Sequence, residues 1–157
     1  MALNAYLKLA GEKQGEIKGS TTLRGREGLI MVIAYNHDVT IPIDVVSGLP
    51  SGKRKHTPLV ILKEIDKSSP SLMTMLIKNE NIKQWELRFW QPSFSGTEVQ
   101  HFTIQLQNAS IVDIRQEMLN NKYPENSQHR EREFVSFRYQ KISWTWEETR
   151  QTCEDSW

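Results

Sequence analysis

The chain contains one cysteine, Cys153, so a disulfide bond within the chain is excluded. This cysteine lies in a polar segment, residues 147–157, near the end of the sequence. A catalytic thiol needs a neighbouring base, and no histidine, asparagine or aspartate partner can be assigned to Cys153 from the sequence. We therefore predict a surface thiol rather than a nucleophile.

Long hydrophobic runs are also missing. No stretch approaches the roughly 18 consecutive apolar residues that a membrane-spanning helix needs, so no membrane insertion is expected. Residues 1–10 carry no basic segment, and Asn4 and Lys8 interrupt their apolar run, which excludes a typical secretory signal peptide. If the protein is exported, we expect a route that does not read a cleaved signal.

An excess of charge of one sign is absent as well. Lys and Arg number 20 and Asp and Glu number 19, which gives a net charge of +1. A balanced chain has no general attraction to nucleic acid or to an anionic membrane. It also repels copies of itself only weakly at long range and therefore tolerates self-association. The length suits a single domain, residues 1–157, with a sizeable core.

The sequence has no recognisable nucleotide, metal or catalytic motif. Three residues, not four, separate Gly48 from Gly52, and Arg54 stands where a phosphate-binding loop needs a Ser or Thr. Glu64 and Asp66 lie two apart on one strand, so they cannot flank a substrate bond as an acid–base pair. No histidine pair has ligand spacing, and a solvent-facing strand position fits His101. The histidines are His37, His56, His101 and His129. We predict no cofactor, no metal and no enzymatic activity.

Short apolar and alternating segments predict a mainly β fold. Residues 29–35 form a continuous apolar run, which is typical of a buried core strand. Pro42 cannot donate a ladder hydrogen bond, so residues 39–46 are expected to form an edge or bulged strand. Further strands are predicted at residues 6–9, 59–62, 84–89, 101–106, 111–114, 135–139 and 142–146.

One helix is predicted, at about residues 69–79. Ser69 can cap its first turn, and Pro70 suits its first position, where no backbone donor is needed. Leu72, Met75, Leu76 and Asn79 recur at helical spacing, and Met73 and Ile77 widen the apolar face. A single short helix cannot build a core, so it must cover a sheet. Together the elements predict a β-barrel of two packed antiparallel sheets with one flanking α-helix.

The last third of the chain combines a polar loop with two alternating strands. Residues 117–133 are the most polar stretch and predict a long loop, as residues 11–28 do earlier. The step from Tyr139 to Ile142 breaks the period of two and implies a bulge or tight bend. Trp144 and Trp146 share a strand face with Ile142, which favours core packing over an interface anchor.

A basic cluster occupies a loop at residues 47–58, which contains two prolines and two glycines. Its residues are Ser51, Gly52, Lys53, Arg54, Lys55 and His56. No aromatic side chain interleaves the cations, so the nucleic-acid signal is weak and a solvated loop tip is the simplest interpretation. The sharper alternative is a contact with an acidic surface of a neighbouring copy. Candidate receivers are Glu131 and Glu133, or Glu147 and Glu148.

Six segments along the chain carry a further signal through their order and spacing. They are Ala5-Tyr6-Leu7-Lys8, the cluster Ser51–His56 with Pro58-Leu59, Lys63-Glu64-Ile65-Asp66-Lys67-Ser68-Ser69-Pro70, Ser95-Gly96-Thr97-Glu98, Pro124-Glu125-Asn126, and Val135-Ser136-Phe137 leading to Ile142-Ser143-Trp144-Thr145-Trp146. Together they resemble the haemolysin-coregulated protein (Hcp) family, the tube subunits of bacterial type VI secretion. The resemblance covers about residues 2–146.

The resemblance implies a barrel of two packed sheets without an active site. It implies a homo-hexameric ring, stacked rings, and three kinds of partner: a contractile sheath, a VgrG-type spike and effector proteins held in the lumen. It also implies assembly in the bacterial cytoplasm and secretion without a cleaved signal peptide, with Ser51–His56 as a subunit or ring contact. The alternative is a monomeric β-barrel module that binds a ligand or carbohydrate on its tryptophans, and oligomeric state distinguishes the two.

Overall fold

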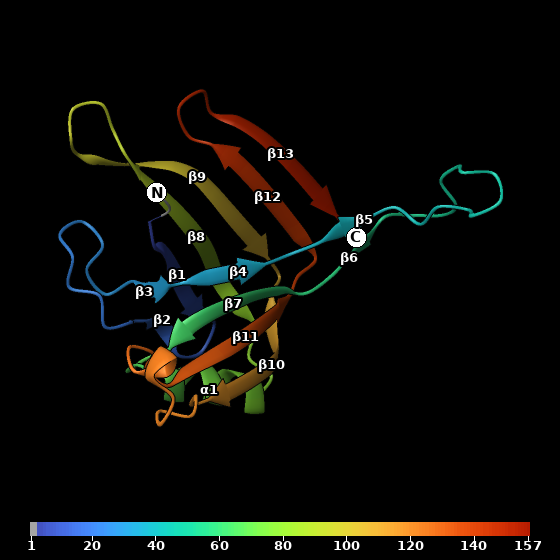
Figure 1. Ribbon diagram of the computed structural model, residues 1–157. Coiled ribbons are helices and arrows are strands. Elements are labelled where there is room, and N and C mark those ends of the chain that lie inside the picture. Colours follow the sequence, from blue (N-terminus) through green and yellow to red (C-terminus); the bar gives the residue numbers. More distant parts are fainter. Residues whose placement is uncertain (1–2) are drawn as a thin grey trace.

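The computed structural model describes residues 3–157, and antiparallel strands dominate it (Figure 1). The larger sheet contains β1 (Ala5–Gly11), β2 (Gly15–Ile17), β3 (Ile30–Val32), β8 (Ile82–Pro92), β9 (Glu98–Gln107), β12 (Lys141–Trp146) and β13 (Gln151–Ser156). Its strands lie in the order β13-β12-β9-β8-β1-β2, and β3 pairs with β1 as well.

A second sheet contains β4 (Ala34–Asn36), β7 (Leu59–Glu64), β10 (Ser110–Glu117) and β11 (Arg132–Arg138), in the order β10-β11-β7-β4. A separate two-stranded ladder pairs β5 (Val39–Thr40) with β6 (Lys55–His56). Helix α1 (Ser69–Ile77) follows β7 and packs near β10, and a 3-10 helix, Pro124–Asn126, lies in the loop before β11. No helix within residues 3–157 is long and apolar enough to cross a membrane.

Side chains from both sheets and the helix form one hydrophobic core. On β7 and β11 the buried positions alternate, because successive side chains of a strand point to opposite faces. Leu59, Ile61, Val135 and Phe137 from these strands are fully buried with Leu72 of the helix. The prediction of a mainly β fold with two packed antiparallel sheets and one flanking helix is therefore confirmed. Within residues 3–157 the two sheets pack face to face, and no strand pairing closes them into a barrel.

The run predicted as one core strand at residues 29–35 is two strands in two sheets. β3 pairs with β1, β4 pairs with β7, and the chain crosses between the sheets at Ile33, whose N–H donates to the carbonyl of Leu62 at 2.9 Å. Ile30 and Val32 are buried, whereas β4 is exposed throughout. Apolar composition made the whole run resemble a buried strand, but β4 is the edge of its sheet.

A second sheet crossing explains the period break between Tyr139 and Ile142. β11 belongs to the four-stranded sheet and β12 to the larger one. The side chains that point into the core therefore change from odd-numbered to even-numbered residues where the chain passes from one sheet to the other. Tyr139 itself is buried at the turn. The predicted tight bend is confirmed, and its cause is the crossing.

The N-cap of the helix lies one residue earlier than predicted. Ser68 is the N-cap, and Pro70 lies in the first turn. The Ser69 hydroxyl does not cap the helix; it donates to Glu133 Oε1 at 2.7 Å and accepts from Lys63 Nζ at 3.2 Å. The helix ends at Ile77 rather than at residue 79. Local sequence could not identify this partner because Glu133 lies on a distant strand.

Two segments for which no strand was predicted contain strands. Within residues 11–28, β2 forms a hairpin with β1. The polar tail forms β13, which pairs along all of β12 and places Cys153 opposite Trp144. β13 lies at the edge of the larger sheet and is mostly exposed, so it lacks the apolar alternation by which a half-buried strand is recognised. Cys153 is exposed, as predicted.

Candidate interaction surface

The segment between β4 and β7 projects from the body of the protein as a long hairpin, drawn at the right of Figure 1. We call residues 38–57 the arm. At its root, Val39 pairs with His56 and Thr40 with Lys55. Further out a single bridge joins Ile43 and Pro50. Only Val39–Thr40 of the strand predicted at residues 39–46 forms a ladder, because the arm lacks a neighbouring sheet beyond its root.

The outer part of the arm exposes apolar side chains. Val45 and Val46 are 96% and 97% exposed, and neither packs on the body. The other exposed apolar side chains of the outer arm are Ile41, Ile43 and Leu49. Contiguous apolar side chains exposed on a soluble protein are typical of a surface that binds a partner.

The basic cluster on the returning strand of the arm divides into three parts. Ser51 and Gly52 shape the return: the Ser51 N–H donates to the Pro42 carbonyl at 2.7 Å, and Gly52 has a φ of +101°, which favours glycine. Arg54 and His56 pair with the body of the same chain, although the Arg54 side chain stays half-exposed, whereas Lys53 and Lys55 are exposed and unpaired within residues 3–157. The structure thus leaves only Lys53 and Lys55 of the cluster's cations open to solvent without a salt bridge inside residues 3–157.

Asp155 of β13 pairs with two residues of the basic cluster, Arg54 and His56. Its carboxylate pairs with the Arg54 guanidinium, and His56 Nε2 lies 2.6 Å from Oδ2. Arg54, then His56, hold the pKa of Asp155 well below its usual range, against the opposing effect of burial. Sequence reasoning missed this acid because Asp155 lies in the polar segment at residues 147–157, for which no strand was predicted.

The predicted acidic receivers differ in their availability. Glu133 is fully buried against Lys63, so it cannot receive a neighbour's cations, and that interpretation is wrong. Glu147 already accepts from Arg150 at 2.6 Å and from the Thr103 hydroxyl at 2.5 Å. Glu148 is exposed and half-exposed Glu131 has only a long contact, so these two remain candidates.

An apolar groove of about 470 Å³ lies between the β4 edge and the outer ends of β8, β9 and β12. Its aromatic side chains stack edge to face, with ring centres 5.1 Å apart for Tyr35 and Phe89 and 5.7 Å apart for His101 and Trp146. Its lining includes Ile33, Tyr35, Phe89, His101, Phe102 and Trp146. Part of this apolar surface is open to solvent, since Ile33 and Tyr35 are 42% and 45% exposed.

The groove corrects two predictions. His101 was expected to face solvent, but it lines the groove half-buried, and burial lowers its pKa. The prediction of core packing holds for Trp144, which packs on the core, and is wrong for Trp146, which is 39% exposed. Trp146 lies at the last paired position of β12, where it lines the groove rather than the core.

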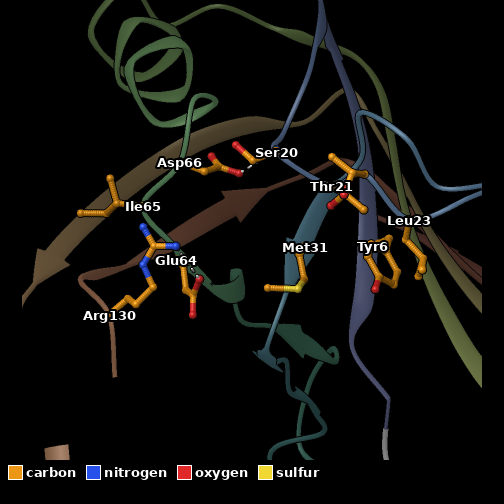
Figure 2. Close-up of a pocket in the computed structure, with 10 residues that line it drawn as sticks. Tyr6, Ser20, Thr21, Leu23, Met31, Glu64, Ile65, Asp66 and Arg130 are labelled. Carbon is orange, nitrogen blue, oxygen red and sulfur yellow. Dashed lines mark hydrogen bonds and ion pairs between the residues drawn. The ribbon is translucent and has the colours of Figure 1, made fainter. Parts of the chain in front are cut away.

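A second hollow, of about 460 Å³, lies between residues 20–23 and the end of β7 (Figure 2). Its carboxylates are already engaged: Asp66 Oδ2 accepts from the Ser20 N–H at 3.3 Å, and Glu64 lies 3.8 Å from Arg130. Asp66 also accepts from the Ser68 N–H at 2.9 Å, as expected of an acid at the helix entry. In residues 3–157 no group of three or more His, Cys, Asp or Glu side chains is placed to hold a metal ion.

The sequence matches, over residues 6–146, the family described as "Type VI secretion system effector, Hcp". It is 39% identical over 166 aligned residues to the "Major exported protein" of Pseudomonas aeruginosa, covering 100% of this chain and 96% of that protein. Its fold is similar to Hcp1 from the E. coli EAEC 042 pathovar, with a TM-score of 0.89, 34% identity and 99% of both chains covered. It is also similar to the secreted protein Hcp3 of Pseudomonas aeruginosa, with a TM-score of 0.79, 32% identity, and 98% of this chain and 99% of that chain covered.

Proposed function

The chain belongs to the Hcp family of the type VI secretion system, and from this premise we propose that it is a structural tube protein rather than an enzyme. Six copies would close into a ring, and rings would stack into a tube that holds effector proteins in its lumen. A contractile sheath and a VgrG-type spike are the further partners. We propose that residues 1–157 act as one domain.

We also propose that the protein assembles in the bacterial cytoplasm and is then secreted without a cleaved signal peptide. The name of the Pseudomonas aeruginosa relative, "Major exported protein", supports export.

The observation that carries the assembly proposal is that the molecule has two exposed apolar surfaces at different places, the outer arm and the groove. Burying apolar surface gains about 25 cal/mol per Å², so both features favour contact with another copy. The two surfaces differ, so a contact between them is head-to-tail. Head-to-tail contacts close into a ring or continue as a stack, depending on their rotation.

The competing function is that of a monomeric module binding a ligand or carbohydrate in the groove, favoured by the exposed face of Trp146. Native mass decides between them. We expect light scattering of the purified protein to give a mass near six chains, with ring-shaped particles in negative-stain images. A monomer across a wide concentration range would contradict the tube proposal and favour the binding module.

Reversing the two outward charges of the basic cluster tests the arm as a contact. We expect the double variant Lys53→Glu/Lys55→Glu to weaken ring formation or stacking about tenfold, or about 1.4 kcal/mol, because it repels an acidic receiver. Arg54 is left unchanged, since it pairs with Asp155 of its own chain. The measurement is the concentration dependence of native mass and of tube length.

A matched control reverses two exposed lysines outside the arm, Lys67→Glu and Lys122→Glu, with the same change in net charge. This control should assemble like the parent protein. If the arm variant assembles as well as the control, Lys53 and Lys55 are not at a subunit or ring contact.

A further inference from the structure

Four side chains from separate segments meet at the root of the arm. Tyr139, in the turn between β11 and β12, places its hydroxyl 2.6 Å from His37 Nε2 and 2.6 Å from His56 Nδ1. The other nitrogen of His56 lies 2.6 Å from Asp155 of β13. The cluster therefore connects His37, just before the arm, and His56, on its returning strand, to the C-terminal strand.

The proton positions in this cluster follow from counting donors. The Asp155 carboxylate only accepts, so His56 carries a proton on Nε2 and, when neutral, offers a bare Nδ1. The single hydroxyl proton of Tyr139 then points to His56 Nδ1. His37 must donate its Nε2–H to the Tyr139 oxygen. With both rings neutral, every donor has an acceptor.

One additional proton can be accommodated, but two cannot. If His56 gains a proton, its Nδ1–H donates to Tyr139, and the hydroxyl turns toward His37, which must then have a bare Nε2. If His37 is protonated as well, both rings donate to the same oxygen, and the hydroxyl proton has no acceptor in the cluster. The two positive rings would also repel each other, with centres 6.2 Å apart.

The surroundings oppose this second proton. Burial lowers the pKa of His37, and the charge of His56 lowers it further, while Asp38 raises it. Burial, together with the charge of Asp155, raises the pKa of Tyr139, so it stays a neutral hydroxyl.

The other groups packed around the cluster complete its electrostatics. The rings of Trp144 and Trp157 lie against His37 and His56 and are uncharged. Arg54 shares the Asp155 carboxylate with His56, and the Lys141–Glu154 pair joins β12 to β13 close by. The charges of this last pair cancel, so Asp155, with Asp38 next to His37, supplies the negative charge that balances the positive rings and Arg54.

We propose that His37, His56, Tyr139 and Asp155 form a proton-sensitive latch that holds the arm root on β13 at neutral pH and releases it when both histidines are protonated. Because the pKa of His37 is lowered in the folded state, the latch adds stability above the ordinary histidine value of 6.5 and loses it as the pH falls below that value. Since the arm is the proposed assembly contact, release would also weaken assembly in mild acid, and this consequence rests on the proposed function.

Amide hydrogen exchange measured by mass spectrometry on the full chain tests the latch itself. Between pH 7.5 and pH 5.0, exchange in residues 37–40, 54–57 and 151–157 should accelerate on the order of tenfold, after correction for the direct effect of pH on the chemistry. Core strands β8 and β9 should not change. No acceleration, or the same acceleration in the core strands, would overturn the proposal.

Two variants separate the latch from general loosening. Tyr139→Phe keeps the ring but removes the shared hydroxyl, so the arm root should exchange rapidly at both pH values. His37→Gln retains an N–H donor for Tyr139 but cannot titrate, so the root should stay protected at both. Tyr123→Phe, at an exposed tyrosine, is the control and should behave like the parent. A full pH response in His37→Gln would overturn the latch.

Native mass at the same two pH values keeps the two proposals apart. Arm release at pH 5.0 with an unchanged hexamer supports the latch and shows that the arm is not the assembly contact. Assembly without any pH-dependent exchange at the root overturns the latch and leaves the proposed function in place.

Discussion

Replacing Lys63 by methionine is expected to lower the free energy of unfolding by about 3–5 kcal/mol. Lys63 and Glu133 are both completely buried, and Nζ lies 2.6 Å from Oε1. Removing the ammonium leaves the carboxylate buried with only neutral donors, the Ser69 hydroxyl at 2.7 Å and the Gln116 amide at 3.0 Å. Chemical denaturation of the variant and the parent under identical conditions measures the difference.

The double variant Lys63→Met/Glu133→Leu is the informative comparison. An apolar pair of similar volume replaces a buried ion pair with little loss, so the double variant should be more stable than Lys63→Met alone. Lys67→Met, at an exposed lysine four residues away, should change the free energy of unfolding by no more than about 0.5 kcal/mol. If Lys63→Met were as mild as Lys67→Met, the buried pair would not stabilise the junction of β7, β11 and the helix.

Truncating Phe137 to alanine should cost a similar amount, about 3–5 kcal/mol. Phe137 is fully buried on β11 and meets Trp85 of the opposite sheet edge to face, with ring centres 5.4 Å apart. Its removal leaves a cavity between the two sheets that neither sheet can fill without distorting its ladder. The loss should appear as a lower midpoint of chemical denaturation.

A phenylalanine on the surface provides the control. Phe94, in the turn between β8 and β9, is fully exposed, and Phe94→Ala should change the free energy of unfolding by no more than about 0.5 kcal/mol. Equal losses for the two variants would mean that contact between the two sheets does not carry the stability of the core.

Alternation along single strands predicted much of the core. Leu87, Ile104 and Val135 are buried at the positions where a period of two places them. The apolar spacing around Leu72 likewise predicted the helix, and Leu72 and Met75 are buried as expected, whereas Ile77, predicted on the same face, is exposed at the end of the helix. These features are local: the period of a strand or helix sets which side chains share a face, whatever the rest of the chain does. The six spaced segments also predicted the family, which is confirmed over residues 6–146.

Features that depend on distant partners were missed or misread. Lys63 is buried at the position that follows the alternation of Leu59 and Ile61. Its ammonium pairs with the nearby Asp66 at 3.1 Å, but its fully buried partner, Glu133, lies on a strand 70 residues away. β13 consists of polar residues and exists because β12 offers a free edge. The break at Ile33 depends on which sheet each half of the apolar run joins.

The same distinction between local and distant determinants applies to the candidate interaction surface. Composition located the outer and returning part of the arm, residues 47–57, and its basic cluster, since prolines, glycines and like charges mark an exposed loop wherever it lies. The first part of the arm was predicted as a strand, of which only Val39–Thr40 forms. Composition could not show that Arg54 and His56 turn inward to Asp155 while Lys53 and Lys55 remain exposed. That division depends on tertiary folding, which brings a carboxylate from the far end of the chain within hydrogen-bonding distance, and short-range sequence patterns hold no record of such contacts.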